Sequence, residues 1–114
     1  MSDCIFCKIA AKTIPSKIVH EDDKVVAFDD VNPQAPTHVL LIPRKHVASI
    51  AEMNEADAGL LGHLMLTGHK IAKQKGIAEG GYRLVVNTGK FGGQTVFHLH
   101  LHVLGGRPMH WPPG

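Results

Sequence analysis

The chain has 114 residues, of which 44% are hydrophobic and 19% charged, a balance typical of one compact globular domain and not of a disordered chain. Its formal net charge of +2 is too small to indicate nucleic-acid binding through phosphate neutralisation. No apolar run reaches the roughly 18 residues of a membrane span, and no segment resembles a secretory signal. We therefore expect a single cytoplasmic domain, with no nucleic acid and no membrane as partner.

The first part of the chain predicts a short N-terminal helix and three strands. They are expected at residues 6–12 for the helix and at 18–20, 24–28 and 38–42 for the strands. Two prolines within residues 32–36 require a loop, since proline is compatible with neither a ladder nor a helix interior. The apolar run that follows this loop predicts a strand buried on both faces.

The second part predicts one long helix and two more strands. Asn54 is a good N-cap, and the apolar periodicity that follows it ends at Gly76. Residues 82–87 predict a strand, and a glycine-rich loop leads into residues 96–104, the longest predicted strand. Because strands outnumber helices, we expect an α+β fold with a mostly antiparallel sheet and one long helix packed on it.

The last predicted strand carries three alternating histidines, His98, His100 and His102, from a chain that has nine. Side chains of a strand alternate between faces, so these three would share one face, with Phe97, Leu99, Leu101 and Val103 on the other. Three imidazoles in register would repel one another when protonated, so the arrangement points to chemistry and not to packing.

Two kinds of chemistry fit the alternating histidines. They could ligate a catalytic zinc ion, as in a zinc-dependent phosphoesterase, or a neutral imidazole could attack an electrophile directly. The preceding Gly92-Gly93-Gln94-Thr95 combines flexible backbone N–H groups with an amide and a hydroxyl, a set that can hold an anion. This placement suggests a phosphate held beside a histidine.

Residues 92–104 resemble the signature of the histidine triad (HIT) family, in which three histidines alternate with hydrophobic residues. The resemblance covers nearly the whole chain, which is similar to the Hint branch of that family. The further segments that carry it are 5–6, 27–31, 33–38, 42–43 and 105–114.

The resemblance implies a single HIT domain over residues 1–114, with 105–114 as a C-terminal tail, and a homodimer whose sheets join. It implies hydrolysis of purine nucleoside 5′-phosphoramidates to the nucleoside monophosphate, without a catalytic cofactor. His100 would attack the α-phosphorus and form a nucleotidyl-histidine. His38 and His98 would support the triad, and His102 would help to hold the phosphate or its leaving group. A non-catalytic nucleotide-binding or scaffold protein is the alternative outside enzymes.

The resemblance also implies a nucleotide site. Asp30 would accept hydrogen bonds from the ribose, although Asp29-Asp30 before Asn32-Pro33 is also ordinary turn chemistry. The purine would lie among Ile5, Phe6, Ile9, Phe28, Val31 and Leu40. The phosphate or its leaving group would meet Asn87, Gly93, Gln94 and Thr95, and Trp111 would reach the partner subunit's site.

Cys4 and Cys7 are the only cysteines and form a CxxC pair. The spacing fits two zinc ligands, a redox pair, or two unpaired thiols. Some bacterial HIT relatives are similar in holding structural zinc with such a pair and two histidines, here His46 and His98. His98 is therefore expected either to bind zinc or to support the triad.

The remaining histidines are expected outside the site. His20, His63 and His69 are interpreted as solvated surface residues. An exposed tryptophan on a tail is unfavourable, so Trp111 is expected to pack on another subunit or, alternatively, on its own.

Overall fold

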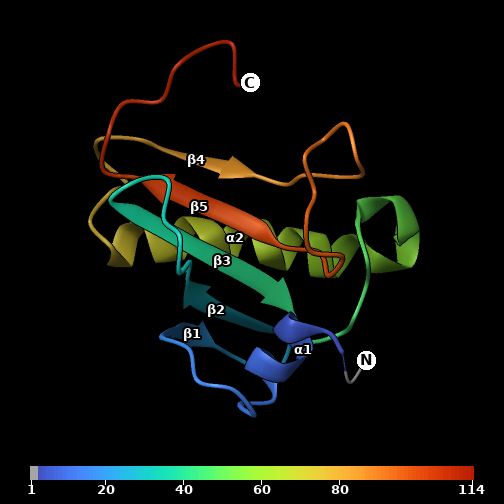
Figure 1. Cartoon of the computed structure of the whole chain (residues 1–114). Helices are drawn as coiled ribbons and strands as arrows, with labels where there is room; N and C mark the ends of the chain where they lie inside the picture. Colours follow the sequence, from blue (N-terminus) through green and yellow to red (C-terminus); the bar gives the residue numbers. More distant parts are fainter. Residues whose placement is uncertain (1–2) are drawn as a thin grey trace.

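The computed structural model describes residues 3–114, which form a five-stranded antiparallel sheet covered on one face by a long helix (Figure 1). The strands are β1 (Ile18–Glu21), β2 (Val25–Asp29), β3 (Thr37–Pro43), β4 (Tyr82–Val85) and β5 (Leu101–Gly105). The helices are α1 (Ile5–Ala10) and α2 (Ala58–Gln74), with 3-10 turns η1 (Ile50–Glu52) and η2 (Glu55–Asp57) before α2. The strand order is β1-β2-β3-β5-β4, and the predicted α+β fold is confirmed.

The central strand β3 is buried on both faces, as its continuous apolar sequence predicts. Val39 and Leu41 belong to a core under α2, whereas Leu40 and Ile42 pack with α1 on the opposite face. Burial of one such aliphatic side chain contributes about 1.5–3 kcal/mol, so β3 anchors both layers. The predicted site histidines lie on and beside this strand.

The sequence predicts a helix that begins directly after Asn54, but the 3-10 turn η2 follows Asn54, and α2 itself begins at Ala58. Asn54 Oδ1 accepts from the Ala56 backbone N–H at 2.9 Å, and Asp57 Oδ2 accepts from the Asn54 N–H at 3.1 Å. This capping box lies at the start of η2, which leads into α2. Gly76, with φ of +75°, follows the C-cap of α2 and prevents the helix from continuing. Gly68 lies where the helix meets the sheet, and a Cβ there would be 2.9 Å from Leu101 Cδ2.

The last strand is shorter than its sequence predicts. β5 begins at Leu101 and not at residue 96, and the seven-residue β3 is the longest strand. The segment before β5 leaves the ladder because its polar groups bond elsewhere: the Leu99 N–H donates to the Val47 carbonyl at 2.7 Å. His98 and His100 therefore lie outside the strand, so the prediction that three histidines share one strand face is wrong in this detail.

Smaller differences concern the ends of elements. α1 ends at Ala10, because Lys12 adopts a left-handed φ of 61°, and β4 ends at Val85. Phe97, expected on the buried apolar face, is 56% exposed. Residues 106–114, most of the predicted tail, form neither helix nor strand. Within residues 3–114, none of the helices combines the length and apolarity that a bilayer crossing requires.

Candidate functional site

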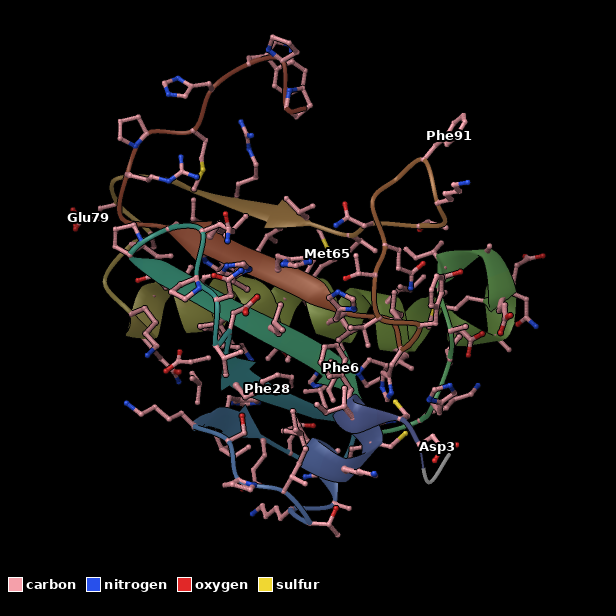
Figure 2. All side chains as sticks on the ribbon, in the orientation of Figure 1. Asp3, Phe6, Phe28, Met65, Glu79 and Phe91 are labelled. Atoms are coloured by element: carbon pink, nitrogen blue, oxygen red, sulfur yellow. The ribbon has the colours of Figure 1, made fainter. Side chains whose placement is uncertain are left out.

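A cavity of about 490 Å³ lies between α1 and the sheet, on the face opposite α2. One wall is apolar and contains Phe6, Ile9, Phe28 and Leu40. Phe6 and Phe28 lie beside each other in an edge-to-face contact, with ring centroids 5.4 Å apart (Figure 2). The other wall is polar and is formed by Asp30, His38, Thr95, His100 and His102. The cavity thus offers an apolar floor for a flat ring and a polar end for a charged group.

His100 is held as one defined tautomer. Its Nδ1 lies 2.7 Å from the main-chain carbonyl oxygen of His98, and a carbonyl oxygen can only accept a hydrogen bond. Nδ1 therefore carries a proton, and in the neutral ring the lone pair is on Nε2. The ring is 7% exposed and stands edge-on to Phe6. A neutral imidazole with a free Nε2 facing a cavity is a nucleophile that needs no separate base.

A chain of hydrogen bonds fixes the tautomers of His38 and His102. The Gln34 backbone N–H donates to His38 Nδ1 at 3.0 Å, so the proton of His38 is on Nε2. His38 Nε2 lies 2.9 Å from His102 Nδ1, which must accept, so His102 carries its proton on Nε2. That buried Nε2 has no hydrogen-bond partner among residues 3–114. A buried donor without an acceptor costs about 1–3 kcal/mol, and an anionic oxygen in the cavity would satisfy it.

The same surroundings keep these two imidazoles neutral. Burial lowers the pKa of His38, although the Asp30 carboxylate, 3.4 Å from its Nε2, opposes the change. Burial and the neighbouring His100 and His38 rings lower the pKa of His102 to about 4. Neither ring is therefore protonated near neutral pH, in agreement with the hydrogen-bond chain.

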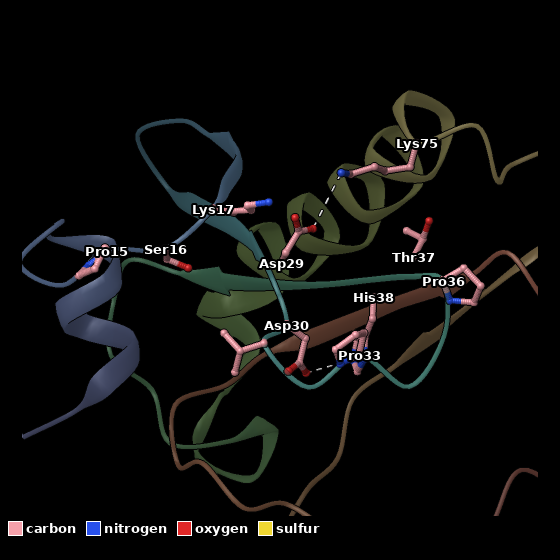
Figure 3. Close-up of a pocket in the computed structure, with 11 residues that line it drawn as sticks. Pro15, Ser16, Lys17, Asp29, Asp30, Pro33, Pro36, Thr37, His38 and Lys75 are labelled. Carbon is pink, nitrogen blue, oxygen red and sulfur yellow. Dashed lines mark ion pairs between the residues drawn. The ribbon is translucent and has the colours of Figure 1, made fainter.

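Asp30 lies at the edge of the cavity, directly after β2. Its Oδ1 accepts from the Asn32 backbone N–H at 2.9 Å, which is the turn geometry that the sequence also suggested. Its Oδ2 faces His38, and both residues border a shallow side depression of about 690 Å³ that also contains Asp29 and Lys75 (Figure 3). One carboxylate therefore closes the turn and faces the site. Val31 beside it is 97% exposed.

The loop before His98 is held by Gln94. The buried Gln94 amide donates to the Ala48 carbonyl at 2.7 Å and to the Val96 carbonyl at 3.1 Å, and its Oε1 accepts from the Gly89 N–H. The side-chain amide thus donates to one main-chain carbonyl in the loop and to another in the segment after β3. Gly93, with φ of +84°, supplies a conformation that glycine adopts without strain. Thr95 borders the cavity, and the contact of these residues with phosphate stays a prediction.

The second candidate site is a cluster of Cys4, Cys7, His46 and His98, whose ligand atoms lie within 4.8 Å of one another. His98 Nδ1 is 3.3 Å from Cys4 Sγ and 3.2 Å from His46 Nδ1, and Cys7 Sγ is 3.3 Å from His46 Nδ1. A tetrahedral zinc ion with Zn–S of about 2.3 Å and Zn–N of about 2.0–2.1 Å would give N–N and S–N separations of about 3.3 and 3.5 Å. The four donors therefore fit zinc in type and spacing.

His98 takes part in both sites through different atoms. Its Nε2 lies 2.8 Å from the Pro43 carbonyl and donates to it, which leaves the Nδ1 lone pair for the cysteine cluster. Burial lowers the pKa of His98, so its ring is neutral, as a metal ligand must be. Its main-chain carbonyl meanwhile holds His100. The two expectations for this residue are thus compatible: the ring belongs to the cluster and the carbonyl to the nucleophile.

The structure does not bring His98, His100 and His102 together as one metal site. In the described part of the chain, His98 belongs to the cysteine cluster, His102 lies with Asp30 and His38, and His100 belongs to neither group. A zinc-dependent phosphoesterase built on all three histidines therefore lacks its ligand set here.

The remaining predicted residues lie at the rim of the main cavity or away from it. Asn87 borders a second depression that contains His38 and His102, and Ile5 is half exposed at the rim of the cavity. Trp111 is 82% exposed, so packing on its own subunit is wrong, and contact with a partner stays a prediction.

The histidines that the sequence predicts as solvated surface residues form side-chain hydrogen bonds. His20 Nε2 and His63 Nε2 lie 3.1 and 2.9 Å from the same Asp22 oxygen, and His69 bonds the Tyr82 hydroxyl. Sequence reasoning also missed two main-chain groups of the site, the Gln34 N–H and the His98 carbonyl. No side-chain motif marks such groups, because every residue carries them.

Comparisons with known proteins agree with this fold. A family model described as HIT domain matches residues 11–109. An uncharacterized HIT-like protein from Synechococcus elongatus is 55% identical over 112 residues, 98% of this chain and 97% of that protein. The crystal structure of a HIT family hydrolase from Legionella pneumophila is 52% identical, covers 98% of this chain and 100% of its own, and superposes with a TM-score of 0.96. A HIT family hydrolase from Clostridium thermocellum is 49% identical, with 96% of each chain covered and a TM-score of 0.93.

Proposed function

The chain belongs to the HIT family, and from this premise we propose that it hydrolyses purine nucleoside 5′-phosphoramidates, the activity implied by its resemblance to the Hint branch. Solved neighbours named as HIT family hydrolases support a HIT-type nucleotide hydrolase. The observation that carries the finer proposal is the His100 ring, with Nδ1 protonated and held by the His98 carbonyl and Nε2 free at the cavity.

The reaction proceeds in two displacements on phosphorus. The substrate nitrogen takes up a proton from solvent, His100 Nε2 attacks the α-phosphorus, the P–N bond breaks, and the neutral amine leaves. A nucleotidyl-histidine results. Water then attacks the same phosphorus, the P–N bond to His100 breaks, and the nucleoside monophosphate leaves with His100 restored.

The neighbouring residues position the substrate. The unpartnered Nε2–H of His102 donates to a non-bridging phosphate oxygen, and His38 holds His102 in the tautomer that allows this. Asp30 accepts hydrogen bonds from the ribose hydroxyls. The purine lies on the apolar wall formed by Phe6, Ile9, Phe28 and Leu40.

We place a structural zinc ion at the Cys4–Cys7–His46–His98 cluster, where donor type and spacing support it. Bound there, zinc supplies a four-ligand crosslink between the N-terminal segment and the residues on either side of the site. Catalysis at His100 itself uses no metal ion in this proposal.

A homodimer joined at β4 completes the proposal. β4 is an edge strand of the sheet, and exposed apolar residues such as Met65 and Leu66 lie on the neighbouring α2. Met65 also borders an apolar cavity of about 230 Å³ with Val86, the residue next to β4. Pairing of two β4 edges would bury this surface and satisfy the free backbone groups of the edge strand. Trp111, exposed in one subunit, would then be near the partner's site.

Trapping of the covalent intermediate tests the function. The protein is mixed with adenosine 5′-phosphoramidate labelled at phosphorus, quenched in mild base and digested, and the labelled peptide is mapped. We expect label on His100, none in His100→Asn, and a rate at least 10³-fold lower in that variant, in line with the loss of a covalent nucleophile. His20→Asn, which changes a histidine outside the cavity, is the matched control.

Two outcomes contradict this proposal. Undiminished turnover in His100→Asn would exclude His100 as the nucleophile. Tight nucleotide binding without turnover of any phosphoramidate would favour the non-catalytic reading.

A further inference from the structure

A second depression of about 580 Å³ adjoins the nucleotide cavity and shares Gln34, His38 and His102 with it. It is bounded by β4, β5 and the C-terminal tail, which leaves the end of β5 and passes beside β4 (Figure 1). Its remaining lining residues are Arg83, Val85, Asn87, Leu104, Arg107, Met109, Pro113 and Gly114. The proposed reaction at the phosphorus does not use most of this lining.

The two arginines bring positive charge to this depression without an acidic neighbour. Arg107 donates from Nε and Nη2 to the Gln34 carbonyl at 3.1 and 2.9 Å, and Arg83 Nη2 donates to the His110 carbonyl at 2.9 Å. Carbonyl oxygens orient a guanidinium but do not neutralise it. Over residues 3–114, no carboxylate lies within ion-pair distance of either arginine. Their charge is therefore available to a ligand.

The position of the depression relative to His100 suggests which part of a substrate would enter it. In a displacement at phosphorus the leaving group departs in line, on the side opposite the attacking nitrogen. A space for the leaving group should therefore border the phosphate-binding side chains but not the nucleophile. The second depression contains His38 and His102 and does not contain His100.

We propose that this depression is the leaving-group subsite and that it selects amines bearing a carboxylate, such as an amino acid linked through its nitrogen. The inference rests on the proposed function and deepens it. Arg83, of which one N–H bond to the tail is seen, can present its fork to the carboxylate. The apolar side chains of Val85, Leu104 and Met109 beside it can contact the carbon atoms of the leaving group.

A matched pair of substrates tests the inference. Adenosine 5′-phosphoramidates of glycine and of glycinamide have nearly the same size and differ by one negative charge. Because their amines differ in intrinsic reactivity, the readout is the change in the kcat/KM ratio of glycine to glycinamide substrate between variants. We expect Arg83→Gln to lower this ratio about tenfold and Arg83→Lys, which keeps the charge, to lower it less. Lys73→Gln removes one positive charge from the exposed face of α2 and should leave the ratio unchanged.

The outcomes separate this inference from the proposed function. An Arg83→Gln ratio within twofold of the unmodified protein, in a variant with an unchanged unfolding midpoint, would overturn the subsite alone. Arg107→Gln gives a second measurement if Arg83→Gln does not fold, and it too should lower the ratio. No hydrolysis of either substrate and no label on His100 would overturn the proposed function, and the subsite with it.

Discussion

At the scale of single residues, the site depends on imidazoles whose tautomers are set by main-chain groups. His98 bonds the Pro43 carbonyl through its ring and holds His100 through its own carbonyl. His38 accepts from the Gln34 N–H and donates to His102. In each imidazole, the contact made by one nitrogen thus determines whether the other nitrogen carries a proton or a lone pair.

His38 acts through His102, so its removal should affect turnover more than substrate binding. In His38→Ala, His102 Nδ1 loses its donor, and the proton is no longer confined to Nε2. We expect kcat to fall about 10–100-fold, a range typical for loss of a positioning partner, with KM changed less than threefold. Steady-state kinetics on adenosine 5′-phosphoramidate measure both. An equal change in KM and none in kcat would contradict this role.

The neutral buried histidines make stability depend on pH. An unfolded histidine has a pKa of about 6.5, whereas burial lowers the pKa of His102 to about 4 and also lowers that of His38. The unfolded chain therefore binds more protons as pH falls below about 6.5, and the free energy of unfolding decreases toward pH 4. Solvent screening reduces the effect of a partly exposed ring, so we expect a loss of about 1 kcal/mol between pH 7 and 5.

Urea denaturation at both pH values measures this loss. His102→Asn should show a smaller loss than the unmodified protein, and His20→Asn should not. An unfolding free energy that rises on acidification would contradict the assignment.

At the scale of elements, the sequence predicts the regular strands and the long helix, but it fails where contacts between residues distant in sequence replace the sheet hydrogen bonds. β3 and α2 follow from an apolar run and from a capped amphipathic pattern, both of which are local signals. Residues 96–100 also read as a strand, but Leu99 bonds Val47 and the His98 ring faces the cysteines, contacts distant in sequence. The residue types of the site were therefore predictable, whereas its tautomers and the irregular path to β5 were not.

The close approach of α2 to the sheet gives a paired test in one helix. Gly68→Ala would place a methyl group 2.9 Å from Leu101 Cδ2 and 3.3 Å from Leu84 Cδ2, so we expect a loss of about 1–3 kcal/mol. Gly62→Ala is the control, because its Cβ would meet nothing within 4 Å. That change should stabilise the protein by up to about 1 kcal/mol. Thermal or urea unfolding compares the two, and equal effects would contradict the packing argument.

The cysteine cluster joins α1 to the segment that carries the nucleophile, so loss of metal should act on structure first. We expect purified protein to contain about one zinc ion per chain by elemental analysis. Cys7→Ser should lower that content and the melting temperature, as should a strong chelator. Chelated protein that remains folded should still form the covalent intermediate at His100. Complete loss of labelling in folded, metal-free protein would instead indicate a catalytic metal.

At the scale of the whole molecule, the proposed homodimer is expected to form through the edge strand β4 and the apolar side of α2. Met65→Glu would place a charge in the proposed interface, so we expect this variant to sediment as a monomer where the unmodified protein sediments as a dimer. Lys17→Gln is the control, because it makes the same change in net charge beside β1, at the opposite edge of the sheet. Sedimentation velocity over a range of concentrations measures the result. Unmodified protein that is monomeric throughout would contradict the dimer.

Gln34 connects the tail to the histidines in a way that a truncation would reveal. Its carbonyl accepts two hydrogen bonds from the Arg107 guanidinium, and its N–H donates to His38 Nδ1. A chain truncated after Gly106 would therefore also lose the hydrogen bonds from Arg107 to Gln34. The loop that contains Gln34 would be less constrained, and the position of His38 would be less well fixed. The C-terminal segment would in this sense help to position the proposed catalytic histidines, although it carries none of the reacting atoms.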